Sequence, residues 1–197
     1  MDNRDRITLY TSQPDGIIEK LRDGEPHRAR LEFIREKYGE AAQVFLNAYA
    51  WFTAQASKLL PRPAEAESAV WAFADLRFLE RGVGSGILEL EVPRNEAVFF
   101  SMRDWNRILN LRYLGSKPAE EAAFEDKLRR HGIAYEGDIF LKPFYPQLKS
   151  ELLRSWERLF RHHEATARGE KPGIADLQAG LWEIRPQWVG DWFADQT

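Results

Sequence analysis

Glu183 is the acidic residue with the least ordinary neighbours in the sequence. It stands between Trp182 and Ile184 near the end of the chain, in a stretch that reads as a short strand. A carboxylate among apolar side chains either has a cationic partner, such as Arg77, or has its pKa raised. The simpler alternative is a glutamate on the solvent face of a strand, because acidic side chains are seldom buried. Glu183 is therefore the candidate catalytic residue, and the alternative stays open.

Aromatic rings beside polar groups could form a ligand site. Seven tryptophans and twelve phenylalanines are many for a chain of this length, and packing in the core is their first explanation. A group of indoles also makes a flat, partly polar wall on which a base or a nicotinamide ring can stack. The predicted ligand-binding residues of this kind are the rings of Trp71 and Trp182, with Arg77 as a polar group.

A glycine-rich run at residues 82–86 (GVGSG) has the composition of a phosphate-binding loop. Such a loop must leave a strand and open a helix, so that the helix N–H groups face the phosphates. Here the glycines open a predicted strand, and no Gly-Lys-Ser/Thr follows. The run therefore predicts a turn.

Ser101 and Asp104 allow two interpretations. They could be a serine nucleophile and its acid, or they could form a helix capping box, whose spacing they have. In a capping box Ser101 accepts a hydrogen bond from the backbone N–H of Asp104, and the Asp104 side chain accepts one in return. No histidine stands near the pair in the sequence. The pattern favours capping.

The four histidines do not have the spacing of a metal site. His162 and His163 are adjacent, so on a helix they point about 100° apart. His27 and His131 stand singly near predicted helix ends, and the chain has no cysteine. We therefore expect no metal.

Alternation of apolar and polar residues with a period of two predicts strands in five places. The predicted strands are Arg6–Ser12, Ala69–Phe73, Gly86–Val92, Ala97–Ser101 and a final one at about Leu181–Arg185. Residues 93–96 (PRNE) are predicted to join the third and fourth strands as a hairpin.

Apolar residues with a helical period, together with glycine and proline stops, predict the helices. They are a short helix around Ile17–Leu21, a second around Leu31–Tyr38, Glu40–Leu60, Arg103–Tyr113, Pro118–Arg130 and about Tyr145–His162. Residues 133–144 read as irregular and residues 164–173 as a polar loop.

The order of these elements favours an α+β fold, because strands and helices do not alternate strictly. We expect one compact domain over residues 1–197, with a small, mostly antiparallel sheet of about five strands packed by six or seven helices. A composition of 44% hydrophobic and 30% charged residues excludes a disordered chain.

Charge and hydropathy restrict the partners and the compartment. The formal net charge is −3, and basic residues on the predicted helices are interleaved with acids, so we expect no nucleic-acid partner. No window approaches the ~20 apolar residues of a membrane span, and the charged start is unlike a secretory signal. We therefore expect a cytoplasmic protein that does not bind a membrane.

Several separated segments resemble the bacterial proteins grouped as domain of unknown function 3841. They occur in the order ITLYTSQ, NAYAWF, AVWAF, LELEVP, FFS, DWNRILN, SWERLF and LQAGLWEI, from about Ile7 to Phe193. The resemblance implies a compact intracellular bacterial protein and no particular activity.

The layout is also similar to that of NAD-dependent ADP-ribosyltransferases and their RNA phosphotransferase relatives. Those folds open with a strand that carries a ligand-contacting polar residue and place a glutamate on a late strand. The similarity implies contacts from Tyr10, Thr11 and Gln13, and Glu183 as the late acid. The opening strand has neither His nor Arg at the position where those enzymes carry one.

Two functions follow as expectations. The first is a small-ligand or nucleotide-binding protein, with NAD as the candidate cofactor, in which Glu183 holds the ribose hydroxyls and stabilises an oxocarbenium-like centre. An aromatic ring would then stack on the nicotinamide. The second is a non-catalytic regulatory module that binds a partner protein, because no complete catalytic set is present.

Overall fold

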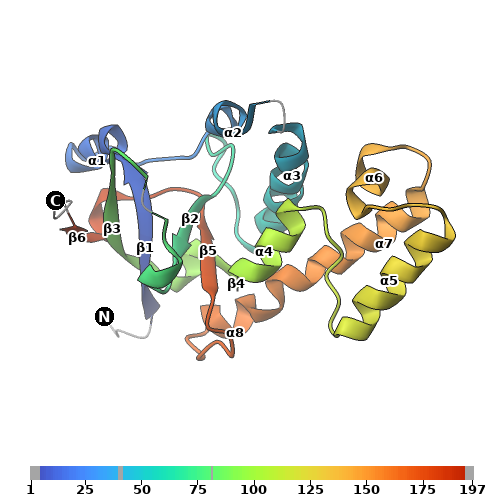
Figure 1. Ribbon diagram of the computed structural model, residues 1–197. Coiled ribbons are helices and arrows are strands. Elements are labelled where there is room, and N and C mark those ends of the chain that lie inside the picture. Colours follow the sequence, from blue (N-terminus) through green and yellow to red (C-terminus); the bar gives the residue numbers. More distant parts are fainter. Residues whose placement is uncertain (1–4, 40–41, 81, 194–197) are drawn as a thin grey trace.

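The computed structural model describes residues 5–39, 42–80 and 82–193, and Figure 1 shows the arrangement of their elements. The strands and helices follow one another as β1 (Arg6–Pro14), α1 (Asp15–Arg22), α2 (Leu31–Tyr38), α3 (Ala42–Leu59), β2 (Val70–Phe73), β3 (Ser85–Pro93), β4 (Ala97–Ser101), α4 (Met102–Leu109), α5 (Pro118–Arg130), α6 (Glu136–Leu141), α7 (Pro146–Trp156), α8 (His163–Ala167), β5 (Leu177–Leu181) and β6 (Val189–Phe193). The predicted α+β class is confirmed.

The strands form one six-stranded antiparallel sheet in the order β4-β5-β2-β1-β3-β6. β1 pairs with β3 along its whole length, from Arg6 opposite Pro93 to Pro14 opposite Ser85. With β2 it shares a single register pair, Tyr10 opposite Phe73. The sheet is therefore continuous on one side of β1 and barely joined on the other.

The predicted hairpin between β3 and β4 is wrong. β3 already pairs with β1 and β6, so neither of its edges is free for β4, which lies at the far edge of the sheet beside β5. Residues 94–96 form a short 3₁₀ helix instead, and the Arg94 guanidinium donates to the carbonyl oxygen of Thr166 in α8 (2.9 Å).

The predicted final strand at about 181–185 is also wrong in its position. The strand in this part of the chain is β5, which ends at Leu181, where the predicted strand was to begin. Glu183 follows β5 in an irregular segment. All five residues of β5 are buried, so the segment LQAGL has no period of two to reveal its register. β6 is a sixth strand that the sequence patterns did not indicate.

The helical predictions differ in how well they hold. α5 has the predicted bounds, while the predicted helix 145–162 ends as an α-helix at Trp156 and continues as a 3₁₀ helix to His162. The segment predicted as irregular contains α6, and the predicted polar loop begins with α8. Both helices are under two turns, which is too short to show a helical period.

The predicted turn at 82–86 is confirmed. Residues 40 and 41 of the predicted third helix lie outside the described residues.

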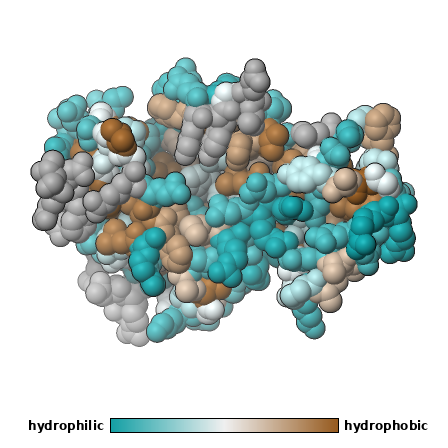
Figure 2. All heavy atoms as spheres, viewed as in Figure 1, coloured by the Kyte–Doolittle hydropathy of each residue, from teal (hydrophilic) through white to brown (hydrophobic). Residues whose placement is uncertain are grey.

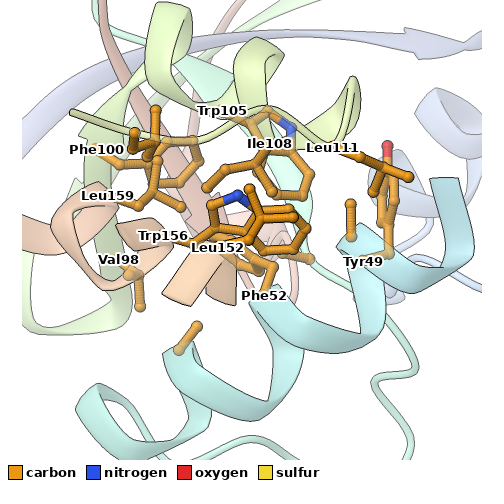
Figure 3. Packing of buried hydrophobic residues seen from close by; sticks show 14 of the residues in the cluster. Tyr49, Phe52, Val98, Phe100, Trp105, Ile108, Leu111, Leu152, Trp156 and Leu159 are labelled. Atoms are coloured by element: carbon orange, nitrogen blue, oxygen red, sulfur yellow. The ribbon is translucent and has the colours of Figure 1, made fainter. Parts of the chain in front are cut away.

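One face of the sheet packs against α3, α4 and α7. Trp71, Gly180 and Val98 are neighbours across β2, β5 and β4, and all three lie on this face. A Cβ atom on Gly180 would lie 2.9 Å from Cζ of Phe52, so only glycine lets α3 approach β5 this closely. Figure 3 shows the ring of Phe52 beside that of Trp105, with ring centroids 5.3 Å apart.

The opposite face carries a second apolar cluster. Its strand residues include Leu9, Leu88, Leu90 and Phe99, which are inaccessible to solvent and pack against α1 and the 3₁₀ helix that contains Trp188. α5 and α6 lie at the end of the molecule away from the sheet (Figure 1). On the face in Figure 2, hydrophilic residues cover much of the helical part, and hydrophobic ones show in small groups. No helix within the described ranges has the length and apolar character of a membrane span.

Candidate functional site

β1 and β2 separate beyond the Tyr10–Phe73 pair, and side chains connect them there. The Thr11 hydroxyl donates to the carbonyl oxygen of Trp71 (2.9 Å), and the amide of Gln13 donates to the Thr11 hydroxyl oxygen (2.8 Å). Both residues are buried, although both are polar. The strand pattern that makes β1 therefore places two hydrogen-bonding side chains at a gap in the sheet.

A pocket of about 330 Å³ opens at this gap, and we name it the carboxamide pocket. Three side-chain amides line it, from β1, α4 and β5, together with two indole rings: Gln13, Asn106, Gln178, Trp71 and Trp105. Gln178 is only 3% exposed, and its Oε1 atom has no hydrogen-bond donor in the described part of the chain.

The aromatic walls of the pocket are fixed by contacts with one another. The indole N–H of Trp71 donates to the hydroxyl oxygen of Tyr49 (3.1 Å). The ring centroid of Trp105 lies 5.1 Å from that of Trp71 and 5.5 Å from that of Tyr49. Edge-to-face and tilted contacts at such distances favour one arrangement of the rings, so the walls are already in place without a ligand.

A second pocket of about 280 Å³ shares Gln13, Tyr49 and Trp71 with the first, and we name it the apolar pocket. Most of its remaining lining is apolar, from β1 to β2: Pro14, Ile17, Ala29, Phe33, Ile34, Ala69 and Val70. Phe33 is 53% exposed. Because three residues line both pockets, the two lie next to each other.

His27 lines the apolar pocket and is held there through its backbone. Its N–H donates to the carbonyl oxygen of Ile184 (2.9 Å), and the N–H of Ile184 donates back (2.8 Å). Burial, with a smaller effect of the Lys20 charge, lowers the pKa of His27 to about 4. The imidazole is therefore neutral at physiological pH.

Glu183 lies outside the residues that line either described pocket. Its carboxylate forms ion pairs with Arg28 (2.7 Å) and Arg185 (2.6 Å). Although burial raises the pKa of Glu183, hydrogen bonds and charge from Arg185 and Arg28 hold it below its ordinary value. The carboxylate thus has cationic partners, but Arg77 is not one of them.

Three other predicted ligand residues also lie away from the pockets. Arg77 is 78% exposed at its side chain and pairs with Asp75 (2.6 Å). The indole N–H of Trp182 donates to the carbonyl oxygen of Leu60 (2.9 Å) inside the core. Tyr10 lies opposite Glu89, and burial and the Glu89 carboxylate raise its pKa.

The structure therefore brings together three of the seven predicted residues, namely Thr11, Gln13 and Trp71. The sequence analysis missed the other polar groups of the pockets, above all Gln178 and His27. Gln178 had a detectable signal, because it is the one polar residue in the apolar stretch LQAGL. His27 had none, because it lies in a segment without a periodic pattern.

The capping prediction at α4 is confirmed in its first half. The Ser101 hydroxyl oxygen accepts from the N–H of Asp104 (3.3 Å), and the same hydroxyl donates to Asp176 (2.6 Å). The return bond is replaced, because the Asp104 carboxylate pairs with Arg161 (2.6 Å). Within the described ranges, no group of three or more His, Asp or Glu side chains could hold a metal ion.

A family model, described as a domain of unknown function (DUF3841), matches residues 8–190. No curated protein matches the chain, and no solved structure does. The matched range includes every described residue that lines the two pockets.

Proposed function

We propose a function for this chain, which belongs to the DUF3841 family of domains of unknown function. It binds a small molecule that has a planar, hydrogen-bonding ring, and the ring occupies the carboxamide pocket. Nicotinamide and the nucleobases are rings of this kind, so NAD falls within the proposed ligand class.

The unpartnered Oε1 atom of Gln178 carries this proposal. A buried acceptor without a donor costs about 1–3 kcal/mol, and such atoms are rare in folded proteins. Gln178 lines the pocket, and rotation of its terminal amide would bring Oε1 to the N–H group of a ligand there. A ligand with an amino or amide group would satisfy the atom and recover that free energy on binding.

The other side chains of the pocket suit the same ligand class. An amide side chain offers a donor and an acceptor side by side, which matches the edge of a nucleobase or the carboxamide of nicotinamide. Gln13 and Asn106 add two more amides, while Trp71 supplies a ring face, because Trp105 is only 2% exposed. Stacking on such faces contributes roughly 1–3 kcal/mol for each base.

ADP-ribosyl transfer is the finer hypothesis, and it needs Glu183 to contact the ligand. Arg28 and Arg185 hold that carboxylate, so we leave Glu183 out of the proposed binding residues. Incubation with labelled NAD tests transfer separately from binding. If the protein transfers ADP-ribose, the wild type releases nicotinamide and Glu183→Gln does not. If NAD stays intact with both proteins, the function is limited to binding.

Isothermal titration calorimetry with nicotinamide and with adenine tests the binding proposal. Gln178→Met should weaken the binding of the ring that binds by tenfold or more, because Met keeps the volume and removes the amide. The matched control is Gln147→Met, which changes an exposed glutamine of α7 and should leave the affinity unchanged. If neither ring binds to the wild type, the proposal is wrong, and the interaction-module alternative gains support.

A further inference from the structure

We infer that the ligand has two parts, and that the apolar pocket takes an aryl or branched alkyl group attached to its ring. This inference rests on the proposed function and narrows its ligand class. The substituent in the apolar pocket carries no phosphate, so the narrowed class no longer includes NAD.

The first support is the continuity of the two pockets. Gln13, Tyr49 and Trp71 line both, so a ligand that contacts Trp71 in the carboxamide pocket is already next to the apolar pocket. The Trp71–Tyr49 hydrogen bond ties two of these shared side chains together. A substituent on the ring therefore has a short path into the second pocket.

The second support is the chemistry of the walls. Ile17, Ile34 and Val70 face the apolar pocket with hydrocarbon side chains, and Phe33 stands half-exposed at its lining. Apolar surface that remains in contact with water in a pocket gains free energy when a ligand covers it. An aryl or branched alkyl group would cover mainly Phe33 and Ile17, because Ile34 and Val70 are only 8% and 4% exposed.

The third support is the lack of charge within the pocket. Of its described lining residues, Arg30 carries the formal charge, and it is exposed to solvent. His27 is neutral because burial lowers its pKa to about 4, and Ser68 is an uncharged hydroxyl. A phosphate moved into this pocket would lose its hydration with one solvent-exposed guanidinium in return, which is unfavourable.

Two matched series of compounds test the inference by calorimetry on the full chain. One is adenine, 9-benzyladenine and AMP, and the other is nicotinamide, 1-benzylnicotinamide and nicotinamide mononucleotide, so that benzyl and ribose phosphate are attached at the same ring nitrogen. In the series whose ring binds, we expect the benzyl compound to bind at least tenfold tighter than the ring alone. The phosphate compound should bind no tighter than the ring.

Variants locate the gain in the apolar pocket. Phe33→Ala should remove most of the benzyl gain and leave the affinity for the unsubstituted ring unchanged. Phe144→Ala is the matched control, because Phe144 is also an exposed phenylalanine (76%) and lines neither described pocket. Phe144→Ala should keep the full gain.

The outcomes separate this inference from the function on which it rests. If a ring binds and needs Gln178 but the benzyl group adds nothing, the inference is wrong and the proposed function stands. If the phosphate compound binds tighter and Arg30→Gln removes the difference, the pocket is a phosphate subsite and the inference is also wrong. If no compound binds, both fail.

Discussion

The two edges of β1 show how this fold separates stability from binding. Toward β3, the backbone is paired along nine residues of each strand, and the side chains of this region join a closed apolar cluster. Toward β2, one register pair is followed by bonds from the Thr11 and Gln13 side chains. Both described pockets open beside this second edge.

The difference follows from which groups complete the hydrogen bonds. A backbone ladder satisfies its own N–H and C=O groups and leaves no polar atom for a ligand. Side chains at the gap keep further donors and acceptors, as Gln13 does. Gln178 adds its side-chain amide from β5, whose backbone is paired on both sides. An incomplete strand pair is thus a place where a sheet can bind a ligand, provided that the paired edge supplies enough stability.

Leu90→Ala should give the largest effect, on stability alone. Leu90 lies in β3, opposite Leu9 of β1, and is fully buried. Its truncation therefore leaves a cavity and costs about 2–5 kcal/mol of unfolding free energy. Urea unfolding measures this loss, with Leu76→Ala, at a 45% exposed leucine, as the small-effect control. A folded Leu90→Ala protein that also loses ring binding would contradict the separation of the two edges.

His27→Gln should remove part of the acid sensitivity of the fold. The folded-state pKa of His27 is about 4, below its ordinary value of 6.5, so the unfolded chain takes up the proton first. The contribution of His27 to the unfolding free energy is therefore fully present above pH 6.5. It is lost as the pH falls toward 4, and the loss is at most roughly 3 kcal/mol.

Urea unfolding between pH 7.5 and 4.5 should show a shallower loss of stability in His27→Gln than in the wild type. Burial also lowers the pKa of His163 and, with the Arg161 charge, that of His162, so both proteins keep a common remaining slope. Equal slopes in the two proteins would mean that the imidazole of His27 is solvated. His27 would then no longer support the inference that the apolar pocket has an uncharged lining.

Gln178→Met sharpens the comparison at the open edge, because stability and affinity should change in opposite directions. Removal of an unpartnered buried acceptor should raise the unfolding free energy by about 1 kcal/mol, while ring binding weakens. Thermal melts without ligand measure the first effect. A loss of more than about 1 kcal/mol would show that the amide stabilises the unliganded fold.

Arg77→Ala should have the smallest effect. Its ion pair with Asp75 is exposed, and water and salt screen such charges, so the unfolding free energy should not change measurably. Affinity for the ring should be unchanged, since Arg77 lines neither described pocket. A threefold or larger loss of affinity would restore Arg77 to the binding site that the sequence pattern predicted.

The elements that the sequence predicts well have local signals. α5 begins at Pro118 and ends before Gly132, and β1 alternates from Arg6 onward, so both have the expected positions. β5 and β4 pair although they are far apart in the chain, and both are buried throughout. No local period records that pairing, which is why the hairpin prediction failed.

The same distinction explains the candidate site. Thr11 and Gln13 were predicted because they end a recognisable strand, and Trp71 because it is an aromatic residue in another. Gln178 and Asn106 reach the pocket through long-range packing of β5 and α4, which composition and spacing do not show. Glu183 was singled out because its sequence neighbours are apolar. Its carboxylate can be buried because Arg28 and Arg185 form ion pairs with it.

A crystal structure of the protein soaked with nicotinamide or adenine tests the central claim most directly. We expect a ring against Trp71 in the carboxamide pocket, with an N–H group within hydrogen-bond distance of Gln178 Oε1. A pocket that stays empty, with the Gln178 amide bonded to another side chain, would contradict the claim that the gap between β1 and β2 is a ligand site.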